Sequence, residues 1–456
     1  MSAARSLASF LTRLTPADLP AQAMDHAAML IASTLASASM GTGIESAQII
    51  RDMARERGGT PQASLWFDNG AKLPVSDAAQ ANAVTSDAAA SDDSDLRQIV
   101  HCGTPLVATS LALAEHLGAG GGASGEEILA AIVIGYEAAG RVTDVMPHFR
   151  SRGFHGSTGA IFAASGAAAR LLKLDETQTT HTIALTATSV SGLVKAADTS
   201  VAREYHCGNA TLLGIQAARA AQRGYTGEAD ILDMKGGFFD VYGGEDGPAA
   251  TATMLQDLGG SWDIVTDMAV KLVPGGHPYH AFGEAAANAS REAQVSPDEI
   301  DSITVSRPGL TALGGPRHPA NLIDMAHSPA YFTAAGAADR AFSWQHASPE
   351  KIADPVIHRL IDKVRVGPPP TAHIDRYRQG ASVTIRTRDG REFTNTVFAP
   401  KGSGLLGIDW ADIDAKFRTL MPLSGLPARQ IEDALGIIRD FRTVSDVSDL
   451  IRLLCS

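Results

Sequence analysis

The first 250 residues are dominated by Ala- and Leu-rich segments whose apolar residues recur with the spacing of an α-helix. Such segments cover residues 25–40, 126–142, 159–172, 175–189 and 209–222. Apolar residues repeating at three and four places form one face of a helix, and that face has to be buried against another element. The 44 glycines and the many alanines favour closely packed helices. The pattern therefore predicts a large, all-helical part.

After about Asp263 the pattern changes. Residues 302–306 alternate between apolar and polar, as in a strand. Residues 381–387 and 391–397 flank Asp389-Gly390, a strong signal for a β-hairpin. A helical stretch at 282–293 precedes these strands, and another at 331–341 lies between the first and the second of them. This middle part is predicted to be a smaller α+β domain.

Beyond Lys401 the pattern is helical again, over residues 410–420 and 427–439. We therefore predict a mostly α protein with three parts: a helical domain at 1–264, an α+β domain at 265–403, and C-terminal helices at 404–456 that return to the helical domain. The Gly-rich run at 118–122 follows no strand, so we interpret it as an exposed loop and not as a phosphate-binding loop. Ser124 followed by Glu127 fits a capping box that opens the next helix.

Charge and cysteine content exclude several classes of function. A formal net charge of −12 argues against nucleic-acid or anionic-membrane partners, although a local cationic pocket for a small anion remains compatible with it. The three cysteines form no CxxC pair, and one chain cannot supply the four thiolates of an iron–sulfur cluster. No apolar run approaches the roughly 18 residues of a membrane span, and the N-terminus lacks a sustained apolar stretch. We expect a cytoplasmic protein.

Histidines beside glycines are the first candidates for proton chemistry. His155 lies in Gly153–Gly159, a loop of small residues that leads into an Ala-rich helix. The free N–H groups of a helix N-terminus suit a carboxylate, so His155 and Ser157 are candidates for substrate contact. The alternative is a helix cap with a satisfied histidine.

Two further segments combine charge with histidine. Arg203 stands near His206 ahead of a helix and could fork a substrate carboxylate, although a surface ion pair between Arg203 and Glu204 would leave the same pattern. Asp92 and Asp93 precede His101, which could combine a base with a group that orients it, although a solvated loop would look the same.

A fourth segment runs from Lys271 to His280 and contains an HxxH pair, His277 and His280. Pro278 stands between the two histidines and disfavours a regular helix, and no carboxylate ligand pattern accompanies them. We therefore predict no metal site there.

In this order, the segments resemble the MmgE/PrpD family, which includes 2-methylcitrate dehydratase, cis-aconitate decarboxylase and iminodisuccinate epimerase. The resemblance covers residues 15 to about 441. It is most specific in GFHGSTGAIFAASGAAARLLKLD (153–175), REYHCGNATLLGIQAARAAQRGYTG (203–227) and KIADPVIHRLIDKVRV (351–366). His327–Tyr331 is similar to the family's F-S-x-x-Y segment, with histidine in place of phenylalanine.

The resemblance assigns roles to individual residues. It places His155 on the histidine of the GFH motif and Lys271 on the lysine before a Pro–small–small turn. His280 falls on the histidine that closes this turn. His277 is close enough in sequence to be the alternative match for that histidine. Tyr331 falls on the family's active-site tyrosine.

The resemblance also reaches the acidic segment. His101 falls on the histidine after the acidic pair, and Asp92 and Asp93 fall on that pair in the motif D-F-D-D-T. This chain departs from the family at Ala90, where the motif begins with aspartate, and at Arg203, where the family has lysine. Arginine effectively cannot lose its proton, so Arg203 would only anchor charge. Cys102, where relatives usually have proline, is more simply a bystander thiol than a nucleophile.

The resemblance implies a large helical domain with a smaller α+β lid, an active site between them, and a homodimer. It implies a cofactor-independent lyase that removes a proton, or CO₂, next to a carboxylate of a small di- or tricarboxylic acid. Dehydration, decarboxylation and epimerisation share an enolate-like intermediate, so the sequence separates them poorly. A dehydratase is placed slightly ahead of a decarboxylase. The alternatives are an epimerase or isomerase, and a carboxylate-binding paralogue that has lost catalysis.

Overall fold

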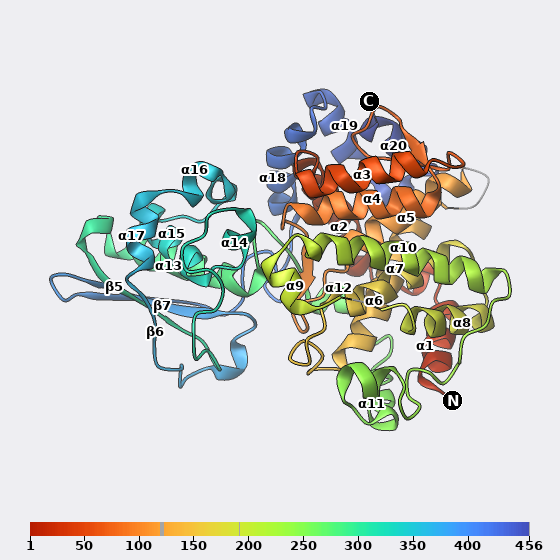
Figure 1. Cartoon of the computed structure of the whole chain (residues 1–456), viewed down its shortest axis with the longest axis horizontal. Helices are drawn as coiled ribbons and strands as arrows, with labels where there is room; N and C mark the ends of the chain where they lie inside the picture. The colour runs from red at the N-terminus through yellow and green to blue at the C-terminus, as the bar shows by residue number, and fades with distance from the viewer. Residues whose placement is uncertain (119–122, 191, 456) are drawn as a thin grey trace. The chain divides into compact units, whose positions relative to one another are not determined.

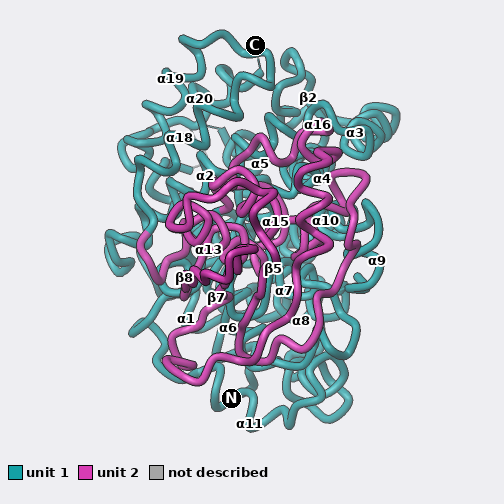
Figure 2. The backbone as a smooth tube through the Cα atoms, turned by 90° about the vertical axis from the view of Figure 1, so that its left-hand side faces the viewer, with its two compact units in different colours: residues 1–270, 408–456 teal, residues 271–407 magenta. Residues whose placement is uncertain are grey.

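Helices make up most of the chain, and the strands form small sheets (Figure 1). The computed structural model describes residues 1–118, 123–190 and 192–455. It divides into unit 1, residues 1–270 and 408–456, and unit 2, residues 271–407 (Figure 2). The domain boundaries expected from the sequence were 264/265 and 403/404. Strand β4 (Met268–Val270) pairs with β3 (Asp93–Asp95), which keeps the residues up to 270 in unit 1.

Unit 1 is a set of packed helices with two short strand pairs, β1–β2 and β3–β4. Strands β1 and β2 are Ala63–Ser64 and Lys72–Leu73. Its helices are α1 (Ala3–Arg13), α2 (Ala21–Gly41), α3 (Glu45–Arg57), α4 (Val75–Ala88), α5 (Gly103–Leu117), α6 (Gly125–Asp144), α7 (Ser157–Leu171), α8 (Glu176–Ala187), α9 (Val194–Thr199), α10 (Ala202–Gln222), α11 (Gly247–Met254), α12 (Asp263–Thr266), α18 (Trp410–Leu420), α19 (Ala428–Arg439) and α20 (Ser448–Leu454).

Glycines let the central helices of unit 1 approach closely, as the composition suggested. A Cβ atom on Gly135 of α6 would lie 2.5 Å from the carbonyl oxygen of Ala163 on α7. On α10, a Cβ on Gly214 would lie 2.7 Å from Ala164. Only glycine fits at such crossings, because any side chain would push the two backbones apart.

Most of the helices predicted from periodicity are confirmed. The exception is the start of α10, which begins at Ala202 and not near residue 209, so Arg203 lies on the helix and not before it. Ser124 caps α6 by accepting a hydrogen bond from the Glu127 N–H at 3.3 Å, as predicted. The predicted loop at 118–122 falls mainly outside the described residues.

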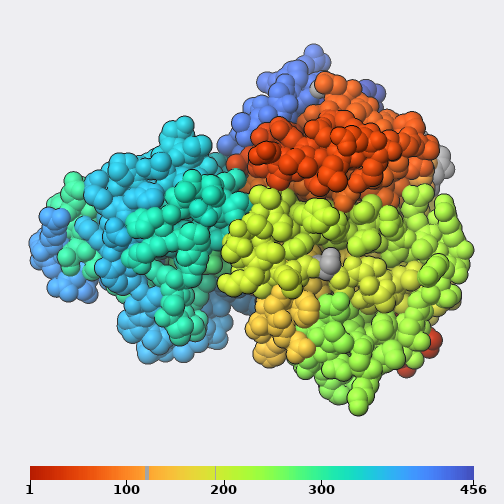
Figure 3. Space-filling view, viewed as in Figure 1, coloured from red at the N-terminus to blue at the C-terminus, as the bar shows by residue number. Residues whose placement is uncertain are grey.

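The C-terminal helices complete unit 1 by packing against α2. The Ser39 hydroxyl of α2 donates to the carbonyl oxygens of Leu420 at 2.8 Å and Met421 at 3.0 Å. Lys416 of α18 is buried, and its ammonium group donates to the Ser33 hydroxyl at 2.8 Å. In the space-filling view, the C-terminal segment (blue) lies beside the first hundred residues (red to orange) (Figure 3).

Unit 2 contains a four-stranded sheet in the order β6-β5-β7-β8. Strand β5 is parallel to β6 and antiparallel to β7. The β7–β8 hairpin turns at Asp389-Gly390, as predicted, and Gly390 has a φ of 88°, which the turn requires. The strands are β5 (Ile300–Ser306), β6 (Val364–Val366), β7 (Ala381–Thr387) and β8 (Glu392–Val397).

Helix α13 packs on β7 and β8 and, with α15, encloses the core of unit 2. Contrary to the expectation that Pro278 would prevent a helix, α13 begins at His277, with Pro278 in its first turn. Proline is tolerated there, because its missing N–H would have no helical partner. The helices are α13 (His277–Ala293), α14 (Leu322–Ala326), α15 (Pro329–Asp339), α16 (Pro349–Ile352) and α17 (Pro355–Ile361).

Within the described ranges, no single helix is long and apolar enough to cross a membrane. Only α2 and α3 taken together, bent by 94°, reach that length and composition.

Candidate active site

Three carboxylates and a histidine gather where α4 ends and α5 begins. Asp87 lies in the last turn of α4, Asp92 and Asp93 follow, and His101 precedes α5. The chain turns between them at Ala90, whose φ of 52° is in the left-handed region. The three carboxylates are buried, so the solvated loop considered for this segment is not what forms.

A hydrogen bond to the Asp93 carbonyl oxygen, beside the Asp92 carboxylate, fixes the tautomer of His101. Its Nδ1 lies 2.6 Å from Oδ2 of Asp92 and 2.8 Å from the carbonyl oxygen of Asp93. The carboxylate and the carbonyl only accept, so Nδ1 carries the proton and Nε2 carries the lone pair. The Asp92 side chain is 1% exposed and that of His101 is 13% exposed. This is an oriented Asp–His pair of the kind that supplies a general base.

Asp93 has a local structural partner. Its Oδ1 accepts a hydrogen bond from the Gly103 N–H at 2.7 Å, at the N-terminus of α5. A Cβ on Gly103 would lie 2.5 Å from the same oxygen, so the close approach needs glycine. This bond holds α5 against the acidic segment that carries the Asp–His pair.

His155 lies in the loop before α7, as predicted, and is buried. Its Nδ1 accepts a hydrogen bond from the Ser157 N–H at 3.3 Å, so its proton is on Nε2. Its ring centre is 6.3 Å from that of His101 and 5.2 Å from that of His206. Burial holds the pKa of His155 well below its usual value. At neutral pH this imidazole is therefore an uncharged N–H donor.

Arg203 is buried on the first turn of α10. Its Nε lies 3.4 Å from Oδ2 of Asp87, and its Nη2 donates to the Asp87 carbonyl oxygen. The pair with Glu204 is longer, at 3.9 Å, and also buried, so the alternative of a surface ion pair is wrong. Burial raises the pKa of Asp87 to about 6, against the opposing effect of Arg203.

Asp87 is a site residue that the sequence did not reveal. Its only signal was a lone carboxylate in an Ala-rich helical run, three residues before Ala90. Although Ala90 removes the first aspartate of the D-F-D-D-T motif, the structure still places a third carboxylate beside Arg203.

Several of these side chains line one small, tightly packed pocket in unit 1. The structure thus brings together His101, His155 and Ser157, which were predicted from the sequence, with Asp87. Cys207 also lines this cavity, and Cys102 is buried nearby. Burial raises the pKa of both thiols well above the usual value, so they are protonated and poor nucleophiles. The full set of lining residues is Asp87, His101, His155, Ser157, Ala160 and Cys207.

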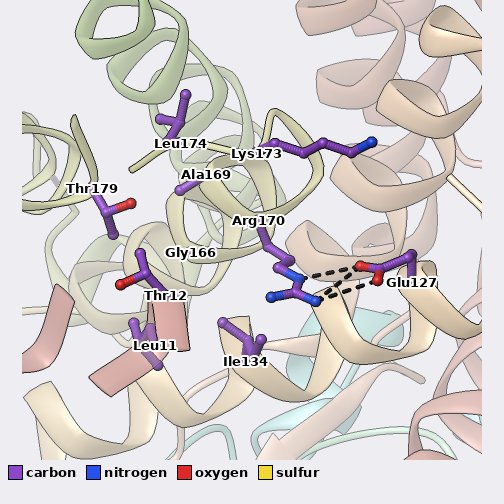
Figure 4. Close-up of a pocket in the computed structure, with 10 residues that line it drawn as sticks. All are labelled: Leu11, Thr12, Glu127, Ile134, Gly166, Ala169, Arg170, Lys173, Leu174 and Thr179. Carbon is purple, nitrogen blue, oxygen red and sulfur yellow. Dashed lines mark hydrogen bonds and ion pairs between the residues drawn. The ribbon is translucent and has the colours of Figure 1, made fainter. Parts of the chain in front are cut away.

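A larger cleft in unit 1, of about 360 Å³, is lined by none of the predicted site residues (Figure 4). It lies between α1, α6, α7 and α8. Arg170 and Glu127 form an ion pair at 3.0 Å along it, and Arg170 also donates to the Leu14 carbonyl oxygen. Lys173 also lines this cleft, but none of the described residues that line it is a histidine. It is therefore a weaker candidate for proton transfer than the histidine cavity.

The remaining predicted residues belong to unit 2. Lys271 is buried and directly follows Val270, the strand partner of Asp93. His277 and His280 lie in the first turn of α13 with ring centres 4.8 Å apart, and Nε2 of His280 is 3.2 Å from the Gly275 carbonyl oxygen. Their roles toward a substrate stay predictions.

Tyr331 lies in the core of unit 2. Its hydroxyl donates to the His346 carbonyl oxygen at 2.8 Å, and burial raises its pKa. The structure thus gives Tyr331 a packing role, and the catalytic role implied by the resemblance stays a prediction.

Fold and sequence together define the class of protein. Residues 5–251 match the MmgE/PrpD N-terminal domain and residues 274–435 match the MmgE/PrpD C-terminal domain, so the chain belongs to the MmgE/PrpD family.

Among individual proteins, the chain is 24% identical to the cis-aconitate decarboxylase of Homo sapiens, over 99% of this chain and 94% of that protein. It is 25% identical to the cis-aconitate decarboxylase of Mus musculus, over 93% and 88% respectively. It is also 25% identical to the cis-aconitate decarboxylase-like protein oryM of Aspergillus oryzae, over 98% and 96%. The two mammalian relatives are lyases by name, which supports a lyase-like function at the level of the family.

Proposed function

We propose that this protein is a cofactor-independent lyase that acts on a small di- or tricarboxylate by forming a carbanion next to a carboxylate. The observation that carries the proposal is the oriented His101–Asp92 pair, which shares one cavity with His155, an uncharged N–H donor. A base and a donor at one cavity are what enolate chemistry requires.

In the proposed mechanism, Nε2 of His101 takes a proton from the carbon next to a carboxylate. The electron pair of the broken C–H bond moves into an enolate-like anion. The Nε2–H of His155 and the guanidinium of Arg203 stabilise its negative charge. Lys271, with the unit 2 histidines and Tyr331, enters the proposal only through the family resemblance.

The relatives favour decarboxylation over dehydration, which reverses the order expected from the sequence. In decarboxylation His101 first takes a proton from solvent on Nε2, then the C–C bond to the carboxylate breaks and CO₂ leaves. The electron pair stays on carbon until this proton of His101 quenches it. In dehydration the same anion expels hydroxide, which leaves as water once it is protonated. The two reactions differ in the leaving group and share the charge that has to be stabilised.

The test is to incubate the protein with cis-aconitate, citrate, 2-methylcitrate and substituted succinates and to identify the products by NMR. Loss of CO₂ supports the decarboxylase, and loss of water supports the dehydratase. Incorporation of deuterium from D₂O without net product loss supports the alternative of an epimerase. His101→Asn should abolish whichever activity is found, and turnover that survives in this variant would refute the proposed base.

A binding-only paralogue is the second candidate, motivated by Ala90 and by Arg203 in the place of lysine. It predicts that some of these acids raise the melting temperature without being converted.

We also propose that the protein forms a homodimer in the cytoplasm. Light scattering coupled to size-exclusion chromatography tests the dimer, and microscopy of a tagged chain in its own cells tests the location.

A further inference from the structure

Two histidines of unit 2 face each other outside the candidate active site. His318 lies in the segment between β5 and α14, and His358 lies on α17. Their Nδ1 atoms are 3.0 Å apart. The ring planes are within 16° of each other and the ring centres are 5.2 Å apart, which fits two rings meeting edge to edge through these nitrogens. The contact thus joins a long connecting segment to a helix.

The outer nitrogens of both rings are held by acceptors. Nε2 of His318 lies 3.0 Å from Oδ1 of Asp362, and Nε2 of His358 lies 2.7 Å from the Ile352 carbonyl oxygen. An ionised carboxylate and a carbonyl only accept, so each Nε2 carries a proton. In the neutral rings, each Nδ1 then carries a lone pair, and the two lone pairs point at each other. A positive particle between them, a proton or a metal ion, removes this repulsion.

We propose that His318 and His358 bind a divalent transition-metal ion such as Zn²⁺ through their Nδ1 atoms. Histidines that bind metals usually donate the other ring N–H to a carboxylate or a carbonyl, which is the arrangement seen at both rings. Two nitrogens bound to tetrahedral Zn²⁺ at roughly 2.05 Å lie about 3.3 Å apart, so the rings need to separate slightly. Each ring must also turn, so that both lone pairs point at the ion and not at each other.

Water completes the coordination. Among the described residues, no group of three His, Cys, Asp or Glu side chains is arranged to hold a metal ion. The His318 side chain is 42% exposed, which leaves room for water ligands. Imidazole nitrogens with water suit Zn²⁺, Ni²⁺ or Cu²⁺ better than Mg²⁺ or Ca²⁺. Asp362 is a positioning residue, because it fixes the His318 ring and does not face the metal.

The experiment uses the full-length chain without a histidine tag at pH 7.5. Zn²⁺ binding is measured by calorimetry, and Co²⁺ reports coordination through its visible absorption. His318→Gln and His358→Gln should each weaken Zn²⁺ binding at least tenfold. Asp362→Asn should weaken it by about tenfold, as expected for a residue that orients a ligand. His373→Asn is the matched control and should change nothing, because His373 is an exposed histidine of the same unit whose φ of 54° asparagine tolerates.

Two results would overturn the proposal. One is a wild-type chain that takes up no Zn²⁺ at millimolar concentration, which leaves a shared proton as the occupant. The other is unchanged Zn²⁺ affinity in both histidine variants, with circular dichroism showing that they are folded. Imidazole ¹⁵N spectra separate the cases, because Zn²⁺ must move the Nδ1 signals of these two rings.

Discussion

Hydrogen bonds give the two central histidines opposite tautomers. In its neutral form, His101 donates from Nδ1 to the Asp93 carbonyl oxygen, beside the Asp92 carboxylate, and keeps a lone pair on Nε2. His155 accepts at Nδ1 from Ser157 and keeps a proton on Nε2. One ring is therefore ready to take a proton and the other to stabilise an oxyanion. The family resemblance did not indicate which histidine is the base and which is the donor, because the hydrogen-bond partners of each ring decide this.

Replacing Asp92 should impair catalysis and leave the fold intact. Asp92→Asn removes the charge that orients His101 and stabilises its protonated form, so kcat should fall by roughly 10²–10⁴-fold. The measurement is turnover of whichever carboxylate proves to be the substrate, with circular dichroism as the check on folding. Asp52→Asn is the control, since that side chain is 65% exposed on α3. Wild-type kcat in Asp92→Asn would contradict the assignment of the base.

Burial of uncharged His155 should make stability sensitive to acid. Its pKa lies well below 6.5 in the folded state, so below pH 6.5 the unfolded chain binds a proton that the folded state does not. Acid then favours unfolding, by up to about 1.4 kcal/mol per pH unit from this group. Urea unfolding at pH 7.5 and 5.0 should show that His155→Asn loses less stability than the wild type on acidification.

The buried carboxyl of Asp87 makes the folded state more stable as the pH falls, which is the opposite of the effect of His155. The wild type must therefore be compared with His155→Asn to isolate the effect of His155. The pKa of Asp87 is about 6 in the folded state against 3.8 unfolded, so the folded state keeps its proton longer as pH rises. The contribution of Asp87 to the free energy of unfolding therefore falls as the pH rises from 4 to 6. Because both proteins contain Asp87, its effect cancels in the difference, and a difference that does not change with pH would refute the prediction for His155.

At the level of elements, glycine at helix crossings is a requirement of packing. Gly135→Ala should destabilise the protein by about 1–3 kcal/mol, because the new methyl group would overlap the α7 backbone. Gly436→Ala on α19 is the matched change, with no atom within 4 Å of the new Cβ. It should stabilise the helix by about 0.5–1 kcal/mol. Denaturant midpoints measure both, and equal effects would contradict the packing argument.

Sequence patterns predicted the elements well where local signals are strong. Asp389-Gly390 fixes a hairpin by backbone geometry alone, and α18 was predicted with its observed ends, Trp410 and Leu420. Predictions failed where tertiary packing decides. The start of α10 contains Arg203 and other polar residues, so it shows no apolar helical periodicity. Burial against other helices stabilises this part of the helix. Asp87 was missed for a related reason, since nothing local distinguishes a buried carboxylate from an exposed one.

At the level of the whole molecule, unit 1 should depend on residues from both ends of the chain. A chain ending at Gly407 lacks α18, α19 and α20 and exposes the face of α2 that α18 and α19 cover. We expect this chain to lose the cooperative unfolding transition of unit 1 in calorimetry. Residues 408–456 supplied as a separate peptide should restore this transition. A truncated chain that unfolds with the wild-type midpoint would show that these helices are dispensable.

The interruption of unit 1 by unit 2 has a consequence for synthesis on the ribosome. Helix α2 emerges early, but the helices that cover it are translated last, after all of unit 2. A nascent chain therefore carries an apolar helix face without its partner for most of the time that translation takes. Chaperone binding to ribosome-bound chains should accordingly persist until the final segment has left the exit tunnel.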